Sequence, residues 1–352
     1  MEQVFITLLV GAIGGFILLR FRVPGALIIG SILFVAIFNI FFDSAYIFRE
    51  GRLVAQVIAG AFIGSGISKS DLFHMRSLGK PAFIIIGGLL ILSIFTGITM
   101  YLISPMDLIT SLMAAVPGGM SYMPLISDEL GADSSKVAIM QFTRMIFGIG
   151  VLPYIIKYFG KNNQKPKATN KLQEIDTIIK ETHTIYDGIL TFAIALIFGY
   201  LGSITGFPSG TLAFALFGTI IYKIKFNKAY VPRRLKQFAQ ILAGSYIGSG
   251  INMSDVLELK YLFLPALVLL TGYFLACVYL GKILEKVHTF TLEEGMFAAT
   301  PAGAADMALL LEDFGISNKD IVVIQIVRMI VVISLFPQIM VMVMKLLQSF
   351  NF

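Results

Sequence analysis

The chain carries the same block of small residues twice. AGAFIGSGISKSD at 59–71 returns as AGSYIGSGINMSD at 243–255, an offset of 184, with nine of thirteen positions identical. The same offset aligns two further pairs of blocks without a gap. They are AAVPGGMSYM (114–123) with AATPAGAADM (298–307), and QFTRMI (141–146) with QIVRMI (325–330). A bias toward Gly and Ala does not produce matches that include Gln, Pro, Arg and Asp, so the chain is a tandem duplication. We predict a first repeat at 1–160, a linker at 161–186 and a second repeat at 187–352.

Both repeats have the composition of membrane segments. Hydrophobic residues make up 57% of the chain and charged residues 14%, whereas a soluble domain carries about 25% charged residues. Several apolar runs have the length of roughly 18 residues or more that indicates a transmembrane helix. These runs are 25–42, 82–103, 137–159, 261–280 and 321–347. The sequence therefore predicts an all-α, multi-pass protein of the lipid bilayer and excludes a soluble fold.

Loop charges predict that the second repeat is upside down relative to the first. Loop 20–22 carries two arginines, whereas its counterpart 202–210 carries no charge. Loop 43–52 has nearly equal numbers of acidic and basic residues, whereas its counterpart 223–236 is strongly basic. Basic loops favour the cytoplasmic side, and a bias that swaps sides between equivalent loops is typical of inverted repeats. We expect two inverted repeats of about five transmembrane helices each, with the Lys-rich linker in the cytoplasm.

Each repeat contains a segment interrupted by Pro and Gly, at 107–130 and at 291–314. Pro lacks an amide hydrogen and Gly admits backbone conformations that other residues resist, so a broken helix or a re-entrant hairpin is expected. Backbone groups freed by a break are tolerated in hydrocarbon only when protein buries them or a wet cavity exposes them. The predicted solute-binding residues of these segments are Pro117, Gly118, Gly119, Ser121, Tyr122, Thr300, Pro301 and Gly303. The alternative is a simple proline kink packed against neighbouring helices.

A Gln–Arg pair follows each interrupted segment, Gln141 with Arg144 and Gln325 with Arg328. The spacing i, i+3 places each pair on one helix face. A buried arginine is costly in a membrane and is therefore a functional candidate, so both pairs are predicted to bind the solute. In the structural alternative, each arginine caps the carbonyl end of a half-helix or neutralises a nearby acid. Those acids are Asp128, Glu129, Glu312 and Asp313.

Asp306 is the acid nearest a predicted break, and its counterpart in the first repeat is Tyr122. A carboxylate present in one repeat alone suits a site for a coupling ion, either H⁺ or Na⁺. The alternative is a salt bridge from Asp306 to Arg144 or Arg328. Both interpretations remain open from the sequence.

The repeated block of small residues predicts close helix packing. Small residues let membrane helices approach each other, and the Ser-Asp that ends each block suits the N-cap of the next helix. The predicted packing residues are Gly60, Gly64, Gly66, Gly244, Gly248 and Gly250.

Several classes of function find no support in the sequence. Cys277 is the single cysteine of the chain and cannot form an intrachain disulfide, and the three histidines share no metal-ligand spacing. The net charge of +6 comes from Lys and Arg in loops, which is the positive-inside pattern of membrane proteins. We therefore expect no catalytic residue, no metal site, no nucleic-acid partner and no cofactor other than Na⁺ or H⁺ as coupling ion.

The twin IGSGI…SD and PGG/PAG…QxxR blocks resemble those of the AbrB-duplication family of bacterial membrane proteins, whose members are often labelled ammonia monooxygenase. The resemblance covers essentially the whole chain and implies a multi-pass protein of the bacterial cytoplasmic (inner) membrane. It also implies a role in transport or in the regulation of gene expression. The oxygenase label is not supported by these residues, because no metal-ligand cluster accompanies it. The layout is similar to sodium-coupled carboxylate symporters at the level of fold alone.

The expected function is secondary active transport of a small polar or anionic solute, a carboxylate or an amino acid, coupled to H⁺ or Na⁺. A membrane sensor that affects gene expression through solute binding is the first alternative. An intramembrane enzyme is the second, and it is disfavoured because the sequence shows no nucleophile–base pair and no metal set. A homodimer is compatible with the sequence, which leaves the oligomeric state open.

Overall fold

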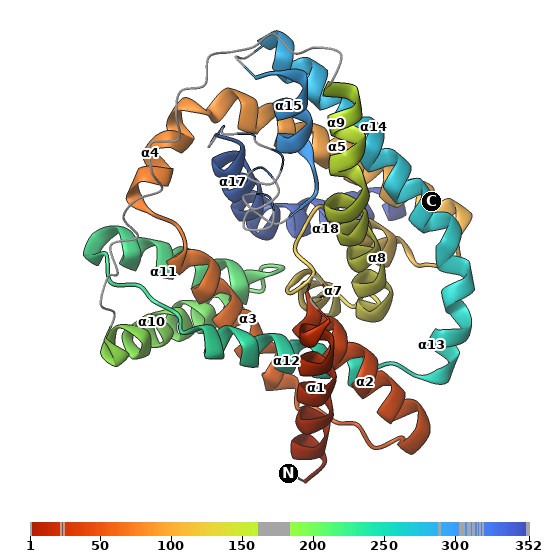
Figure 1. Ribbon diagram of the computed structural model, residues 1–352. Coiled ribbons are helices and arrows are strands. Elements are labelled where there is room, and N and C mark those ends of the chain that lie inside the picture. Colours follow the sequence, from red (N-terminus) through yellow and green to blue (C-terminus); the bar gives the residue numbers. More distant parts are fainter. Residues whose placement is uncertain are drawn as a thin grey trace.

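The computed structural model describes most of the chain. The residues outside this description are Met1, Arg22, Pro24, 161–183, 288–289, 303–306, 308–310, 312–313, 315, 317, 319 and 350–352. Every regular element among the described residues is a helix, which confirms the predicted all-α class (Figure 1). His183, His288, Gly303, Asp306 and most of the predicted linker lie outside the described residues.

The helices of the first half precede the linker. They are α1 (Glu2–Arg20), α2 (Ala26–Phe42), α3 (Arg49–Ser65), α4 (Lys69–Ser77), α5 (Gly79–Ile103), α6 (Leu108–Ala115), α7 (Met123–Glu129), α8 (Ser134–Ile146), the π-helical turn η1 (Phe147–Val151) and α9 (Leu152–Gly160). The helices of the second half are α10 (Ile185–Ile204), α11 (Gly210–Phe226), α12 (Arg233–Ser249), α13 (Met253–Glu258), the 3-10 turn η2 (Leu259–Leu262), α14 (Phe263–Val287), α15 (Leu292–Ala299), α17 (Asp320–Ser334) and α18 (Phe336–Ser349).

The helix bounds repeat at the offset of the sequence duplication. Adding 184 to the bounds of α2, α3, α5 and α6 gives those of α11, α12, α14 and α15. In these four pairs, equivalent sequence blocks therefore form helices of equal length and in the same order along the chain.

Among the described residues, five helical stretches are long and apolar enough to cross a membrane, or up to six if the bent pair α17–α18 is one span. The sequence predicted about ten crossings. The remaining candidates are shorter, since α2, α3, α11 and α12 have 17 residues each, and α3 and α12 begin with charged residues. The described residues thus show a multi-pass membrane protein with fewer long spans than the sequence predicted.

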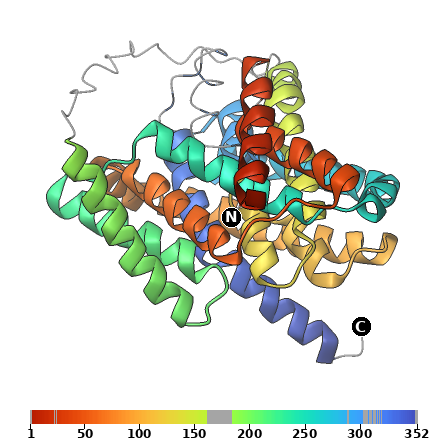
Figure 2. The same ribbon diagram turned by 90° about the horizontal axis from the view of Figure 1, so that it is seen from below.

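The glycine-rich helices pack across the two halves. A Cβ added at Gly60 or Gly64 of α3 would lie 2.6 and 2.7 Å from the carbonyl oxygens of Leu212 and Leu216 in α11. In the second half, α12 packs in the same way on α2 of the first half, and α3 and α12 also contact each other. Figure 1 shows α11, α3, α12 and α2 following one another across the molecule. In the view from below (Figure 2), α10 flanks this row at one end and α1 at the other.

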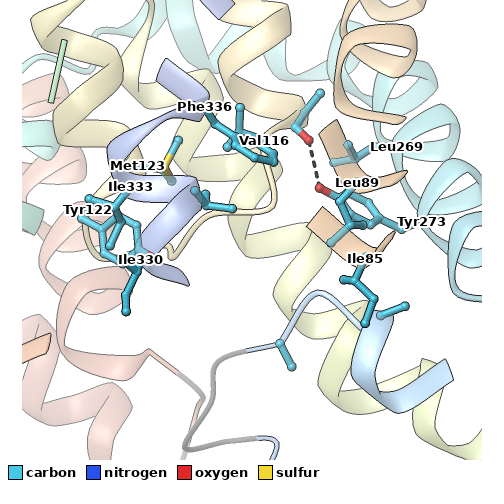
Figure 3. Close-up of a cluster of buried hydrophobic side chains, with 14 of the residues drawn as sticks. Ile85, Leu89, Val116, Tyr122, Met123, Leu269, Tyr273, Ile330, Ile333 and Phe336 are labelled. Carbon is cyan, nitrogen blue, oxygen red and sulfur yellow. Dashed lines mark hydrogen bonds between the residues drawn. The ribbon is translucent and has the colours of Figure 1, made fainter. Parts of the chain in front are cut away.

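The remaining helices form a second body around the long helices α5 and α14, which pack on each other. Its core is apolar and includes Leu89 of α5, Leu269 and Tyr273 of α14, and Phe336 of α18, all at most 1% exposed. Figure 3 shows that Val116, the C-cap of α6, and Met123, the first residue of α7, belong to the same cluster. The connection between α6 and α7 therefore begins and ends inside the protein.

The caps of two short helices differ from the prediction. The N-cap of α4 is Ser68, whose hydroxyl accepts from the Asp71 amide while the Asp71 carboxylate accepts from the Ser68 amide. The equivalent pair in α13 is Asn252 with Asp255. The sequence placed the cap at the Ser-Asp dipeptide, two residues too late, because Asp71 and Asp255 are the acidic partners of a capping box.

Candidate functional site

Gln141 and Gln325 place an amide at the carbonyl end of a half-helix. The Gln141 Nε2 atom lies 3.4, 3.5 and 3.0 Å from the carbonyl oxygens of Met113, Ala114 and Val116, at the end of α6. The Gln325 Nε2 atom lies 3.1, 3.2 and 3.2 Å from those of Phe297, Ala298 and Thr300, at the end of α15. Both side chains are at most 1% exposed. Each glutamine therefore adds a side-chain donor at the carbonyl end of its half-helix, where the intrahelical hydrogen-bond ladder runs out.

The two arginines bind the segments that follow these half-helices. Arg144 Nη2 donates to the carbonyl of Gly118. Arg328 Nη1 donates to the Thr300 carbonyl at 2.7 Å, and its Nη2 donates to the Ala302 carbonyl at 2.6 Å. The arginines are only 3% and 4% exposed. These contacts correspond to the capping role that the sequence left open as the structural alternative.

Capping leaves part of each guanidinium group unused. The Nε and Nη1 atoms of Arg144 and the Nε atom of Arg328 are buried and have no hydrogen-bond partner among the described residues. Neither arginine forms an ion pair within the described part of the chain. Asp128, one of the predicted partners, pairs with Arg52 instead, and Glu312 and Asp313 lie outside the described residues.

Two tyrosines accompany the arginines. The guanidinium carbon of Arg144 lies 5.7 Å from the centroid of the Tyr273 ring, and the Tyr273 hydroxyl donates to the Ala115 carbonyl at 2.9 Å (Figure 3). Electrostatic interactions link both arginines to Tyr122 and Tyr273, and link the arginines to each other. Residues from both halves thus meet at one buried place, which we call the arginine site: Tyr122, Gln141, Arg144, Tyr273, Gln325 and Arg328.

The other predicted residues of the two segments lie at or near this site with different roles. Pro117 is buried, whereas Gly119 and Ser121 are partly exposed. Thr300 is fully buried, and its hydroxyl donates to the Met296 carbonyl of its own helix at 2.9 Å. The Pro301 carbonyl faces Gly148 of η1, where an added Cβ would lie 3.3 Å from it. The second segment therefore packs against a helix of the first half.

Tyr273 and Cys277 belong to this neighbourhood, although sequence reasoning did not select either as a site residue. Both are fully buried, and Cys277 interacts with Thr300 and Arg328. Their first-half counterparts at the offset of 184 are Leu89 and Ser93. The repeat therefore gives no sign that Tyr273 is special, and only its polar hydroxyl inside an apolar run could have marked it.

The predicted packing glycines fall into two groups. Gly60, Gly64, Gly244 and Gly248 face a neighbouring helix, and a Cβ on any of them would lie 2.6 to 2.7 Å from a carbonyl oxygen there. Gly66 and Gly250 are C-cap residues, and a Cβ on either would meet only carbonyl oxygens of its own helix, at 3.5 Å or more.

A large apolar groove lies away from the arginine site. It encloses about 960 Å³ between α5 and α14, and its lining contains neither arginine. Exposed side chains such as Ile91 and Phe95 line it, at 71% and 70% exposure. Such a surface is expected where a membrane protein faces lipid, so the groove is not part of the candidate site.

A family model described as "Transition state regulatory protein AbrB" matches residues 44–344. The chain belongs to this family. The match contains the two Gln–Arg pairs and both interrupted segments, and it agrees with the resemblance noted from the sequence.

Two curated relatives align over most of their length with this AbrB-family chain. "Uncharacterized protein YhjN" of Bacillus subtilis (strain 168) is 24% identical over 312 residues, covering 84% of this chain and 79% of the relative. "Putative regulator AbrB" of Escherichia coli (strain K12) is 22% identical over 307 residues, covering 87% of this chain and 85% of the relative.

Proposed function

We propose that this protein is a secondary active transporter of the bacterial cytoplasmic membrane for a small anionic solute, a carboxylate or an amino acid. The observation that carries the proposal is the arginine site. Two buried guanidinium groups from equivalent positions each retain an N–H group without a partner among the described residues. Desolvated cations with free donors bind carboxylates strongly, and the adjacent tyrosine hydroxyls add polar groups that select the solute.

The architecture supports transport rather than binding alone. Secondary transporters place their sites where helices are interrupted, near the middle of inverted repeats. Here α6 and α15 are half-helices whose ends meet the arginine site from the two halves. The swap of loop charges between equivalent loops supports opposite orientations of the halves in the membrane. We propose about five crossings per half, counting the shorter helices, with H⁺ or Na⁺ as coupling ion.

Proteoliposomes that contain the purified full-length protein test this function. Vesicles with an imposed pH or Na⁺ gradient are exposed to a bacterial metabolite extract, and mass spectrometry identifies what accumulates inside. We expect an anionic solute to accumulate in vesicles with wild-type protein. Vesicles with the double variant R144K/R328K are the control. Equal contents in both sets of vesicles, for every anion of the extract, would contradict the proposal.

Cysteine labelling tests the proposed orientation of the two halves. Single cysteines replace Lys165 in the linker or Ser203 in the last turn of α10, in a Cys277→Ala background. A membrane-impermeant thiol reagent added to intact cells should label position 203 alone, because the linker lies in the cytoplasm in the proposed topology. Labelling of both positions from the same side excludes inverted repeats.

A membrane sensor remains the second candidate function. It is favoured by the family description and by the name of the Escherichia coli relative, which both use the word regulator or regulatory. A sensor binds the solute at the same arginine site without moving it. Solute binding by the purified protein, together with no flux in either direction, would select this candidate. Neither candidate assigns the chain an enzymatic reaction, a nucleic-acid partner or a metal.

A further inference from the structure

A second polar cluster lies where α3, α7 and α12 meet. Arg52 and Gln56 lie one turn apart on α3 and are 6% and 0% exposed. Asp128 and Glu129 end α7, and Tyr246 reaches the cluster from α12. These five residues, which we call the α3–α7–α12 cluster, are separate from the arginine site and have no role in the function proposed so far.

The charge of Asp128 is balanced inside this cluster. Arg52 Nη1 forms an ion pair with the Oδ2 atom of Asp128. The Tyr246 hydroxyl donates to the same oxygen at 2.8 Å. Both donors therefore bind one carboxylate oxygen of Asp128, and the positive charge of Arg52 offsets its negative charge.

The charge of Glu129 is not balanced in this way. Its hydrogen-bond partner among the described residues is neutral, since Gln56 Nε2 donates to Glu129 Oε2 at 3.2 Å. Burial raises the pKa of Glu129, while the Gln56 hydrogen bond and the charge of Arg52 lower it and the neighbouring Asp128 raises it. Burial outweighs the opposing contributions, so the neutral form of Glu129 is favoured relative to an exposed glutamate.

Gln56 can serve both protonation states of Glu129. Its Oε1 atom is buried and has no hydrogen-bond partner within the described part of the chain. When Glu129 is ionised, the amide N–H donates to the carboxylate. When Glu129 is protonated, a half-turn of the amide brings Oε1 to the acid, and the Glu129 O–H donates to it. Protonation would thereby satisfy a buried acceptor that is otherwise unpaired, which stabilises the neutral pair.

We propose that Glu129 and Gln56 form a proton-binding site and, resting on the proposed transport function, that this proton is the coupling ion. A proton fits better than a metal cation because a proton needs only the carboxylate and one acceptor, whereas a metal cation needs several oxygen ligands. The adjacent carboxylate, Asp128, is already bound by Arg52 and Tyr246. Binding is a simple addition of H⁺ to the carboxylate and needs no other reactant.

Other charged groups on the elements around α7 are engaged elsewhere. Lys136 of α8 binds Asp133 at 3.2 Å and Glu258 at 2.6 Å, and Arg144 of α8 binds the Gly118 carbonyl. Asp107 accepts from the Thr110 amide at the start of α6. On α12, the Tyr246 hydroxyl interacts electrostatically with Asp128, Arg52 and Arg49. Among the acids of this region that the structure describes, Asp107 and Glu129 thus have neutral hydrogen-bond partners, and Glu129 is the one that belongs to the α3–α7–α12 cluster.

The second half differs from this arrangement at the equivalent positions that the structure describes. The counterparts of Arg52, Gln56 and Tyr246 are Lys236, Gln240 and Phe62. The ammonium of Lys236 lies 4.0 Å from the centroid of the Phe62 ring, and Gln240 is half-buried where Gln56 is fully buried. A phenylalanine offers no hydroxyl to an acid. The Arg–Tyr environment of Asp128 is therefore not repeated among the described residues, and the counterparts of Asp128 and Glu129, Glu312 and Asp313, lie outside them.

Infrared titration of the purified full-length protein tests the proton site without any transport. The probe is the proton itself, read by the C=O stretch of a protonated carboxyl group, with ionic strength held by choline chloride. We expect a carboxyl band to form at pH values well above about 4.3, the ordinary pKa of Glu. E129Q should lose this band, whereas E50Q, which changes an exposed glutamate on α3, should keep it. Q56L should shift the midpoint of this band, because Gln56 binds both protonation states of Glu129 and leucine binds neither.

Two outcomes of the titration would overturn the proposal. Identical spectra of wild type and E129Q above pH 4.3 would show that Glu129 titrates like an exposed acid. Loss of the band when NaCl replaces choline chloride at constant pH would show a sodium site. In proteoliposomes, E129Q should retain solute exchange and lose at least tenfold in gradient-driven accumulation, and wild-type accumulation by E129Q would remove the coupling role. Absence of flux in wild type would refute transport, and the titration would still decide the proton site.

Discussion

The two halves of this molecule share their caps and differ in what surrounds them. Gln141 and Gln325 reach three carbonyl groups at equivalent positions, with nitrogen–oxygen distances between 3.0 and 3.5 Å. The arginines differ, since Arg328 binds two carbonyl groups and Arg144 binds one. The features kept in both halves are those that hold a half-helix end in place. The features that differ leave free donors and unbalanced charge. These features can make the two halves, and so the two sides of the membrane, functionally different.

The last helix of each half shows the same contrast. In the first half, α8 continues into α9 through the π-helical turn η1, just before Pro153. In the second half, α17 and α18 bend by 46° on either side of Leu335, just before Pro337. A proline lacks the backbone N–H that would bond to the carbonyl one turn earlier, and the helix accommodates the missing bond by a bulge or a kink. The same sequence position has produced a bulge in one half and a kink in the other.

Removal of the glutamine caps should have the largest effect. Q141L or Q325L removes a buried donor that three carbonyl groups share. The first and third of these also accept a backbone N–H, so the middle one, of Ala114 or Ala298, is left unsatisfied at a cost of about 1–3 kcal/mol. We expect both variants to lose most of their folded protein in detergent, measured by fluorescence-detected size-exclusion chromatography, while Q3L at an exposed position stays folded. A half that tolerates the change would show that the two caps are not equivalent.

Alanine at the packing glycines should have the next largest effect. The Cβ of G60A or G244A would lie 2.6 Å from a carbonyl oxygen of the neighbouring helix, and such overpacking costs about 1–3 kcal/mol. The matched controls are G66A and G250A, whose Cβ atoms meet no neighbouring helix within 4 Å. Thermal unfolding in detergent should show lower midpoints for the first pair alone. Equal losses in all four variants would mean that the space around the added methyl group does not decide the outcome.

Lysine at the two arginines should separate binding from stability. Arg144 has two nitrogen atoms without a partner among the described residues and Arg328 has one. R144K should therefore weaken binding of the transported solute more, by about tenfold or 1.4 kcal/mol. R328K should lower the unfolding temperature more, because it loses one of two bonds to the backbone. Isothermal titration and thermal unfolding measure the two effects, and the reverse order would contradict the assigned roles.

Exchange of Tyr246 and Phe62 should have the smallest effect. Y246F removes the hydroxyl that binds Asp128 and makes the two halves alike at this position. Because Asp128 keeps Arg52 and is 29% exposed, we expect a loss of about 1 kcal/mol in chemical denaturation. F62Y should have no such cost to Asp128, which lies against Tyr246 rather than Phe62. A loss for Y246F as large as that for Q141L would show that Asp128 depends on the tyrosine more than on the arginine.

The sequence predicted the helical class, the membrane character and the duplication well, because apolar runs and a fixed offset are local properties of the chain. It did not predict the partners of each helix. The AGxxIGSGI block predicts that α3 and α12 pack closely on a neighbouring helix. It does not predict which helix that is, so the contact of Gly60 with Leu212 of the other half could not be foreseen. It predicted the Gln–Arg pairs as site residues, yet the capping of α6 and α15 depends on a fold that brings residue 141 back to residue 113. From the sequence, Glu129 was a candidate only as a partner for an arginine. Its contact with Gln56 joins residues 73 positions apart, and no local pattern predicts such a contact.

The helices α3 and α12 each pack on a helix of the other half, which constrains the order in which they can assemble during synthesis. The glycine face of α3 is covered by α11, which the ribosome delivers only after residue 226. During translation the first half must therefore wait in the membrane with a narrow, small-residue surface that another helix can occupy. α12, in contrast, emerges when its partner α2 is already in place. The first half is thus the one that needs shielding by the insertion machinery, and truncation anywhere before α11 should leave a fragment that associates with itself or is degraded.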